Sequence, residues 1–93
     1  MADYKFDRNE LRCRGSKIGV VDGKYIRDSH GSKVGEFDGK YIRDSHGSKL
    51  AEFDGKVVRD SHGSRIATID DIKKQIDGVG GLSLVALWVL LVR

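Results

Sequence analysis

A sixteen-residue unit that recurs three times governs what this chain can fold into. Its copies are KIGVVDGKYIRDSHGS from Lys17, KVGEFDGKYIRDSHGS from Lys33 and KLAEFDGKVVRDSHGS from Lys49, and a partial copy, RIATID, begins at Arg65. Repetition at a fixed period is typical of an architecture built from similar units rather than of a single chemical site. The repeat therefore constrains the fold more than the function.

The glycines show that the underlying period is eight residues, since they recur at every eighth position from Gly15 to Gly63. A five-residue strand followed by a three-residue turn that ends in glycine fits this count, because glycine adopts the left-handed conformation of such a turn without steric cost. We expect turns at Ser29-His30-Gly31, at Phe37-Asp38-Gly39 and at their equivalents. The predicted fold is mainly β, an antiparallel meander of about seven to nine short strands with a C-terminal helical segment.

This register places related side chains in rows across the sheet. Ile26 is expected opposite Val34 in an aliphatic row, and Lys24 is expected in a row with Glu36, where charges of opposite sign alternate favourably. On the other face, glycine and alanine positions alternate with Tyr25 and its equivalents, so that each ring can lie over a missing side chain.

Two other arrangements remain open. One has a two-residue type I′ turn at Asp22-Gly23 and a four-residue loop from Ser29 to Ser32. The other is a solenoid with one coil per sixteen residues. The solenoid is less favourable because it stacks Lys24 on Lys40 and other like charges at about 4.8 Å.

The chain divides into a repeat sheet at residues 1–69, with an irregular first hairpin at 1–16, and a C-terminal region at 70–93. In that region Asp70 and Asp71 favour the start of a helix, and three glycines between positions 78 and 81 end it and form a hinge. The apolar tail that follows, LSLVALWVLLV, would span about 16 Å as a helix, roughly half of a bilayer core, so we predict no transmembrane insertion.

Composition restricts the environment and the chemistry. The net charge is +3, with 17 basic and 14 acidic residues, and Cys13 is the only cysteine. No apolar run near Met1 resembles a signal peptide, so we expect a reducing, bacterial-type cytoplasm. In the meander the nearest histidines, His30 and His46, lie about 9.6 Å apart, too far to share one zinc ion. We expect no catalytic residue, no metal and no cofactor.

The phrase GSKVGEFDGKYIRDSHGSKLAEFDG resembles a short glycine-bounded β-repeat of small, largely uncharacterised bacterial proteins. The likeness covers roughly residues 15–69 and lies in the spacing of Gly, Ile-Arg-Asp and Asp-Gly. It implies a β-repeat and no particular activity.

Two functional hypotheses follow, both without enzymatic activity. The first is a structural or protein-interaction module that forms a homo-oligomer, with a dimer favoured, because one tail helix is too short to cover the aliphatic row of a seven-stranded sheet. Its candidate self-association residues are Leu82, Leu84, Val85, Leu87, Trp88, Val89, Leu91 and Val92. The alternative is binding of nucleic acid or another acidic polymer by a basic row on one sheet face. The members of that row are Lys17, Arg27, Lys33, Arg43, Lys49, Arg59 and Arg65.

Overall fold

The computed structural model describes residues 3–78 and 80–92. The strands of this part of the chain are β1 (Tyr4–Asp7), β2 (Glu10–Cys13), β3 (Ser16–Asp22), β4 (Tyr25–Asp28), β5 (Lys33–Asp38), β6 (Tyr41–Asp44), β7 (Lys49–Phe53), β8 (Val57–Asp60), β9 (Arg65–Thr68) and β10 (Ile76–Asp77). Helix α1 (Ile69–Gln75) lies between β9 and β10, and the tail forms α2 (Leu82–Leu87) and a π-helix, η1 (Trp88–Val92). The predicted mainly β meander with a C-terminal helical segment is confirmed.

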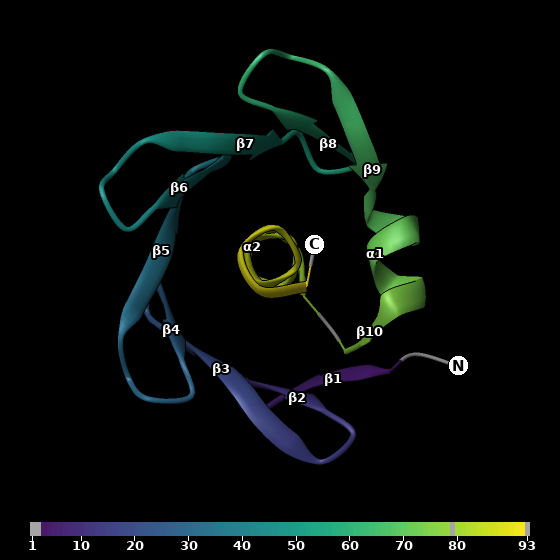
Figure 1. The fold of residues 1–93 in the computed structure, drawn as a ribbon. Coiled ribbons are helices and arrows are strands. Elements are labelled where there is room, and N and C mark those ends of the chain that lie inside the picture. The colour runs from purple at the N-terminus through teal and green to yellow at the C-terminus, as the bar shows by residue number, and fades with distance from the viewer. Residues whose placement is uncertain (1–2, 79, 93) are drawn as a thin grey trace.

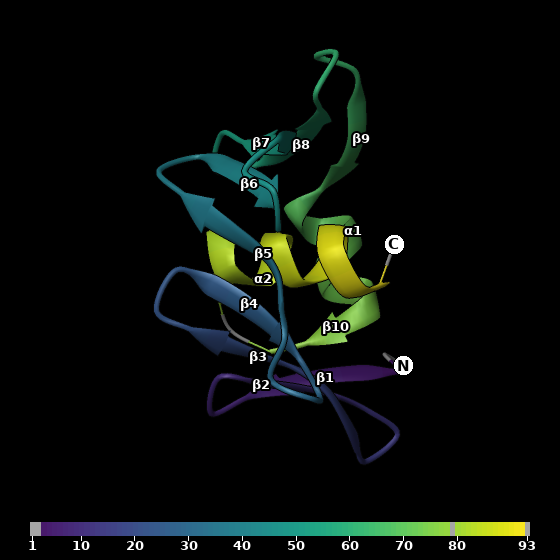
Figure 2. The same ribbon diagram turned by 60° about the vertical axis from the view of Figure 1, so that its left-hand side comes forward.

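The strands form a sheet that curls around the tail helix (Figures 1 and 2). Its order is β10-β1-β2-β3-β4-β5-β6-β7-β8-β9, with antiparallel neighbours throughout except that β10 pairs in parallel with β1. Helix α1 follows β9 and leads into β10, so it completes the ring where the two edges of the sheet would otherwise remain apart (Figure 1). The helix formed by α2 and η1 occupies the centre.

The central helix is apolar apart from Ser83, and the ring surrounds it. Leu84, Val85, Ala86 and Leu87 have no exposed surface, and Trp88 is 7% exposed. A helix without a polar face is stable only where every side is covered. The length argument for a dimer assumed a flat sheet, and this sheet is not flat, so one tail covers the inner side chains of its own chain. Self-association itself stays a prediction.

Half of the predicted turns are confirmed. Gly31 has a φ of +87°, and its N–H donates to Asp28 O at 3.1 Å, which closes the three-residue turn Ser29-His30-Gly31. The other predicted turns are wrong, because Asp22 pairs directly with Tyr25 and leaves only Gly23 and Lys24 between the strands. The alternative two-residue turn at Asp22-Gly23 is also wrong, by one position, because the turn residues are Gly23 and Lys24.

Because this turn is one residue shorter than predicted, one residue in each unit has no cross-strand partner and forms a β-bulge. Ile26 pairs with Gly35 and Arg27 pairs with Lys33, so Val34 has no cross-strand partner. The expected pairing of Ile26 with Val34 is therefore wrong. A bulge bends its strand and increases the local twist, and this curvature is what a sheet needs to close around a helix.

The predicted row of alternating small and large residues is wrong for the same reason. Gly35 and its partner Ile26 are both buried and face the central helix. Tyr25 is paired with Glu36 instead, and both alternate to the outer face. Lys24 does not lie opposite Glu36 as predicted, because Lys24 lies in the two-residue turn, although Lys40 and Glu52 of the same predicted row form an ion pair at 3.9 Å.

Helix α1 begins one residue earlier than Asp70. Thr68 caps it, since the Thr68 hydroxyl accepts from Asp71 N at 3.2 Å while the Asp71 carboxylate accepts from Thr68 N at 3.0 Å. This reciprocal pair satisfies two backbone donors that the first turn leaves free. Ile72 and Ile76 are fully buried, although Ile76 lies in β10 rather than in the helix.

Candidate anion-binding surface

Three pairs of cations lie directly opposite one another on the outer face of the ring. Arg27 pairs with Lys33, and the next two units repeat this arrangement. The members of this outer cationic band are Arg27, Lys33, Arg43, Lys49, Arg59 and Arg65. Side chains opposite one another in antiparallel strands have Cβ atoms about 4.5–5.5 Å apart, so each pair can reach a single anionic group.

The seventh predicted member, Lys17, lies at the start of β3 in a fourth cation pair, two strands from Arg27 and Lys33 in the sheet order and at the same kind of bulge. Its cross-strand partner is Arg12, a residue that the sequence reasoning missed because it precedes the repeat. Arg12 also forms an ion pair with Glu10. The pair of Lys17 and Arg12 therefore has an acidic neighbour, Glu10, on the strand of Arg12.

The predicted row of seven cations is not continuous. On the other side of β6, Arg43 lies opposite Glu36 rather than another cation, and Arg59 lies opposite Glu52. The two-residue turns cause this change. They shift β5 against β6, and β7 against β8, relative to the predicted register. The outer face thus consists of cation pairs separated by single glutamates.

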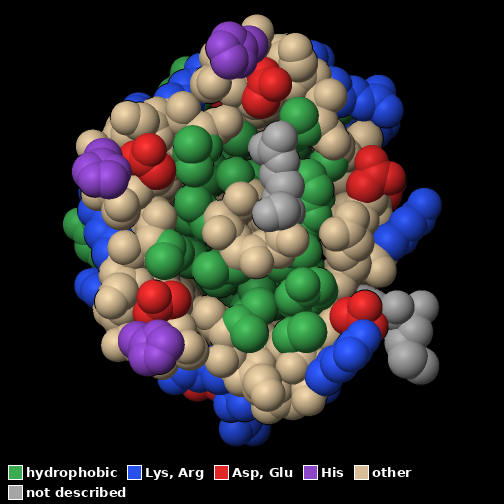
Figure 3. Space-filling model, in the orientation of Figure 1, with side chains coloured by type: hydrophobic (Ala, Val, Ile, Leu, Met, Phe, Trp, Pro, Cys, Tyr) green, Lys and Arg blue, Asp and Glu red, His purple; other side chains and the backbone are tan. Residues whose placement is uncertain are grey.

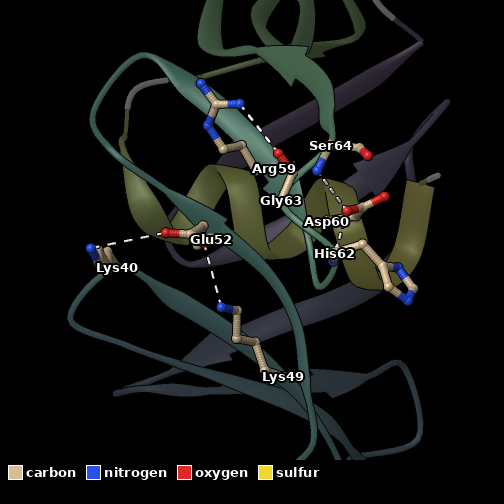
Figure 4. A network of polar contacts seen from close by, with 8 residues as sticks. All are labelled: Lys40, Lys49, Glu52, Arg59, Asp60, His62, Gly63 and Ser64. Atoms are coloured by element: carbon tan, nitrogen blue, oxygen red, sulfur yellow. Dashed lines mark hydrogen bonds and ion pairs between the residues drawn. The ribbon is translucent and has the colours of Figure 1, made fainter.

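Each glutamate lies beside lysines of the band. Glu36 Oε1 is 3.4 Å from Lys33 Nζ. Glu52 lies between two lysines (Figure 4), 3.4 Å from Lys49 Nζ and 3.9 Å from Lys40 Nζ. These ion pairs are partly buried at the surface and contribute little to stability, but they hold the lysine side chains over the outer face.

Three of the four arginines of the band, Arg27, Arg43 and Arg59, are anchored by their own turns. Arg27 donates through Nη1 to Gly31 O at 3.2 Å, and Arg59 makes the same bond to Gly63 O at 3.3 Å (Figure 4). A guanidinium has five donors in a planar fork. In Arg27, Nε also donates to Asp22 Oδ2 at 3.1 Å, so this guanidinium is fixed at two of its nitrogens.

Two tyrosines lie beneath these cations. The Nζ atom of Lys33 is 4.9 Å from the ring centroid of Tyr25, and Lys49 lies at the same distance from Tyr41. Lys24 and Arg27 are also within 6 Å of the Tyr25 centroid, at 5.8 and 5.9 Å. Cations at these distances are attracted to the ring face, so each tyrosine gathers three positive charges.

The three-residue turns project as a rim around one end of the central helix, with His and Asp side chains on it (Figure 3). Asp28 Oδ1 accepts from His30 N at 2.8 Å and from Ser32 N at 3.0 Å. These bonds, that from Ser32 above all, lower the pKa of Asp28. In the part of the chain that the structure describes, no three His, Cys, Asp or Glu side chains come together as a metal site would require.

The candidate self-association residues divide into two groups. Leu84, Val85, Leu87 and Trp88 are buried in the ring of their own chain. The half-buried members are Leu82, Val89, Leu91 and Val92. Figure 3, which looks down the central helix, shows apolar side chains around it within the rim. Of the described helices, none is long and apolar enough to cross a membrane.

Comparisons with protein families, with curated proteins and with solved structures found no match for this chain. The resemblance to glycine-bounded β-repeats therefore stays a prediction. With no relative to supply a function, any assignment depends on the surface just described.

Proposed function

We propose that this chain is a non-enzymatic binding module whose outer cationic band holds a linear polyanion. The observation that carries the proposal is the like-charge pairing of Arg27 with Lys33, which Arg43 with Lys49 and Arg59 with Arg65 repeat. Like charges directly opposite in a sheet are destabilising. An arrangement that breaks a local rule in each of three units is typical of a functional surface.

The chemistry of each pair suits a phosphate or sulfate group. Arg27 offers a planar fork that is already oriented by its bond to Gly31 O, and Lys33 offers a compact charge opposite it. Arginine binds such groups through two parallel hydrogen bonds, whereas lysine acts as a point charge. An anion placed between them would relieve their mutual repulsion.

The band concentrates positive charge on the outer face of the ring. The six cations of the band have Glu36 and Glu52 as cross-strand acidic neighbours, and Arg27 also pairs with Asp22, while the net charge of the whole chain is +3. A local excess of this kind attracts anionic polymers and makes their binding depend on salt. It follows that the outer face, not the total charge, should determine affinity.

Titration of a fluorescent single-stranded oligonucleotide at several salt concentrations tests the proposal. For six contacts, the slope of log K against log salt should be about −4, and Lys33→Ala should make the slope shallower by about 0.7. Lys73→Ala is the matched control, since Lys73 is exposed on α1 outside the band. No binding at low salt, or equal effects of the two variants, would rule the proposal out.

A second candidate function is self-association through the open end of the ring. The observation that favours it is the group of apolar side chains that Figure 3 shows within the rim, together with the half-buried state of Val89 and Val92 in η1. Exposed apolar patches rimmed by polar residues mark interaction sites. A homodimer would cover this end on both copies.

Light scattering after size exclusion tests this second candidate. The full chain should be a dimer, and Val92→Lys should make it monomeric while leaving the fold intact. Val57→Lys places the same change on the outer face of β8 and should leave the dimer unchanged. A monomeric full chain would remove self-association and leave polyanion binding untouched.

A further inference from the structure

The cationic band carries an inference about its ligand, which rests on the proposed function. We propose that the band recognises a dense chain of phosphate groups without reading bases. Inorganic polyphosphate and the backbone of a nucleic acid share this chemistry. The tyrosines of the band would then position cations rather than stack on bases.

The first argument comes from differences among the three units. The cation pair is present in all of them, as Arg27 with Lys33, Arg43 with Lys49 and Arg59 with Arg65. The aromatic ring is present in only two, because Val57 takes the place of the tyrosine in the third. The element common to the units is therefore the pair of charges.

The second argument is that each ring is already occupied by the protein itself. Lys33 lies 4.9 Å from the centroid of Tyr25, and Lys24 and Arg27 lie at 5.8 and 5.9 Å. A base that stacked on the ring face beneath Lys33 would displace the ammonium that binds phosphate. Proteins that bind single strands by base stacking need free aromatic faces. In this chain the face of each tyrosine ring is occupied by cations.

The third argument is geometric. Equivalent pairs are two strands apart, a separation of about 9.6 Å along the sheet, and the outer face between them carries Glu36 or Glu52. A polymer with a charge on every repeating group can place a phosphate at each pair in any register. A ligand read base by base would need a fixed register, which the intervening glutamates do not provide.

Three probes at equal phosphate concentration test the inference on the full chain: inorganic polyphosphate, single-stranded DNA and an abasic deoxyribose phosphate chain of the same length. We expect all three to bind within a few-fold of one another. A double variant, Tyr25→Leu with Tyr41→Leu, should weaken all three to the same extent. Phenylalanine at both positions keeps the ring face and should restore binding.

The outcomes separate the two proposals. Binding of DNA alone, or a loss of more than tenfold for the abasic chain, would overturn the base-independent inference while polyanion binding stood. A leucine variant that weakened only DNA would do the same. If none of the probes bound the folded wild-type chain, the proposed function itself would fall. Circular dichroism of each variant establishes that the ring is intact.

Discussion

Leu90 packs directly on Gly35, with no room for a side chain between them. A Cβ atom placed on Gly35 would lie 2.6 Å from Leu90 Cδ1 and 2.5 Å from Arg43 O. The same relationship joins Leu91 to Gly19 one unit earlier. These contacts bring η1 against the backbone of β3 and β5, and they explain why the inner positions of these two strands hold glycine.

Gly35→Ala should therefore lower the free energy of unfolding by about 1–3 kcal/mol, as overpacking does, measured by urea denaturation. Gly19→Ala should cost less, because its tightest contact is the flexible side chain of Leu91, and Arg27 O lies at 3.1 Å.

Double variants separate these two cases. Leu91→Ala should partly rescue Gly19→Ala, whereas Leu90→Ala should rescue Gly35→Ala much less, because the clash with the Arg43 carbonyl oxygen remains. A coupling energy of at least about 0.5 kcal/mol in the first pair would be a real interaction. Equal coupling in both pairs would contradict this account.

The hydrogen bond from Trp88 Nε1 to Gln75 Oε1, at 3.0 Å, joins the central helix to α1. Gln75→Ala should destabilise the fold by about 1 kcal/mol, because it leaves the indole N–H without this acceptor. Trp88→Phe should make a further Gln75→Ala change nearly neutral. Unfolding followed by circular dichroism suits all four chains, and additive effects would show that the bond contributes nothing.

The buried part of the tail should dominate stability. Leu84 and Leu87 have no exposed surface, while Val92, the last residue of η1, is half-buried. Leu84→Ala and Leu87→Ala should each cost about 2–5 kcal/mol in unfolding free energy, and Val92→Ala should cost less than about 1.5 kcal/mol. If the three variants unfolded at the same urea concentration, the tail would not be the core.

Stability should fall in acid because of the rim carboxylates. The N–H groups of Ser32 and Ser48 donate to Asp28 and Asp44 and lower their pKa values in the folded state. Because the folded-state pKa is depressed, the stabilisation is present above the unfolded-state pKa of about 3.9 and is lost as the pH falls through the folded-state value.

Urea midpoints at about pH 6 and pH 3 measure this loss. Combined Asp28→Asn and Asp44→Asn changes keep an oxygen acceptor for the turn and remove the charge, so they should reduce the difference between the two midpoints. Lys73→Asn is a control on α1, and it should leave that difference unchanged. An undiminished difference in the double variant would assign acid sensitivity to other groups.

Local signals account for the parts of the fold that were predictable. Gly31 ends a turn whose hydrogen bonds lie within five residues, from Asp28 to Ser32, so its spacing alone identifies it. The helix in the tail follows from apolar composition for the same local reason. The cross-strand pairing of Arg27 with Lys33 also depends only on that turn. The sequence pattern therefore predicted both residues in one row.

The rest depends on closure of the ring. The two-residue turn at Gly23 and the bulge at Val34 suit a sheet that curves around a helix. No local sequence pattern predicts that curvature. Strand β10 has two residues and pairs only with β1, far away in sequence. The sequence pattern did not predict that Glu36 separates two cation pairs, because the position of Glu36 opposite Arg43 results from the two-residue turns and the bulges.

The position of the central helix in the sequence has a consequence for synthesis. Strands β1 to β10 all precede α2 and η1 along the chain, so the ribosome makes the surrounding wall before the element that fills it. Each hairpin can form early from local pairing, but the inner surfaces around Ile26 and Ile42 stay uncovered until Leu84 and Leu87 emerge. A nascent chain paused before Leu82 should therefore bind holdase chaperones, and its release should depend on the last eleven described residues.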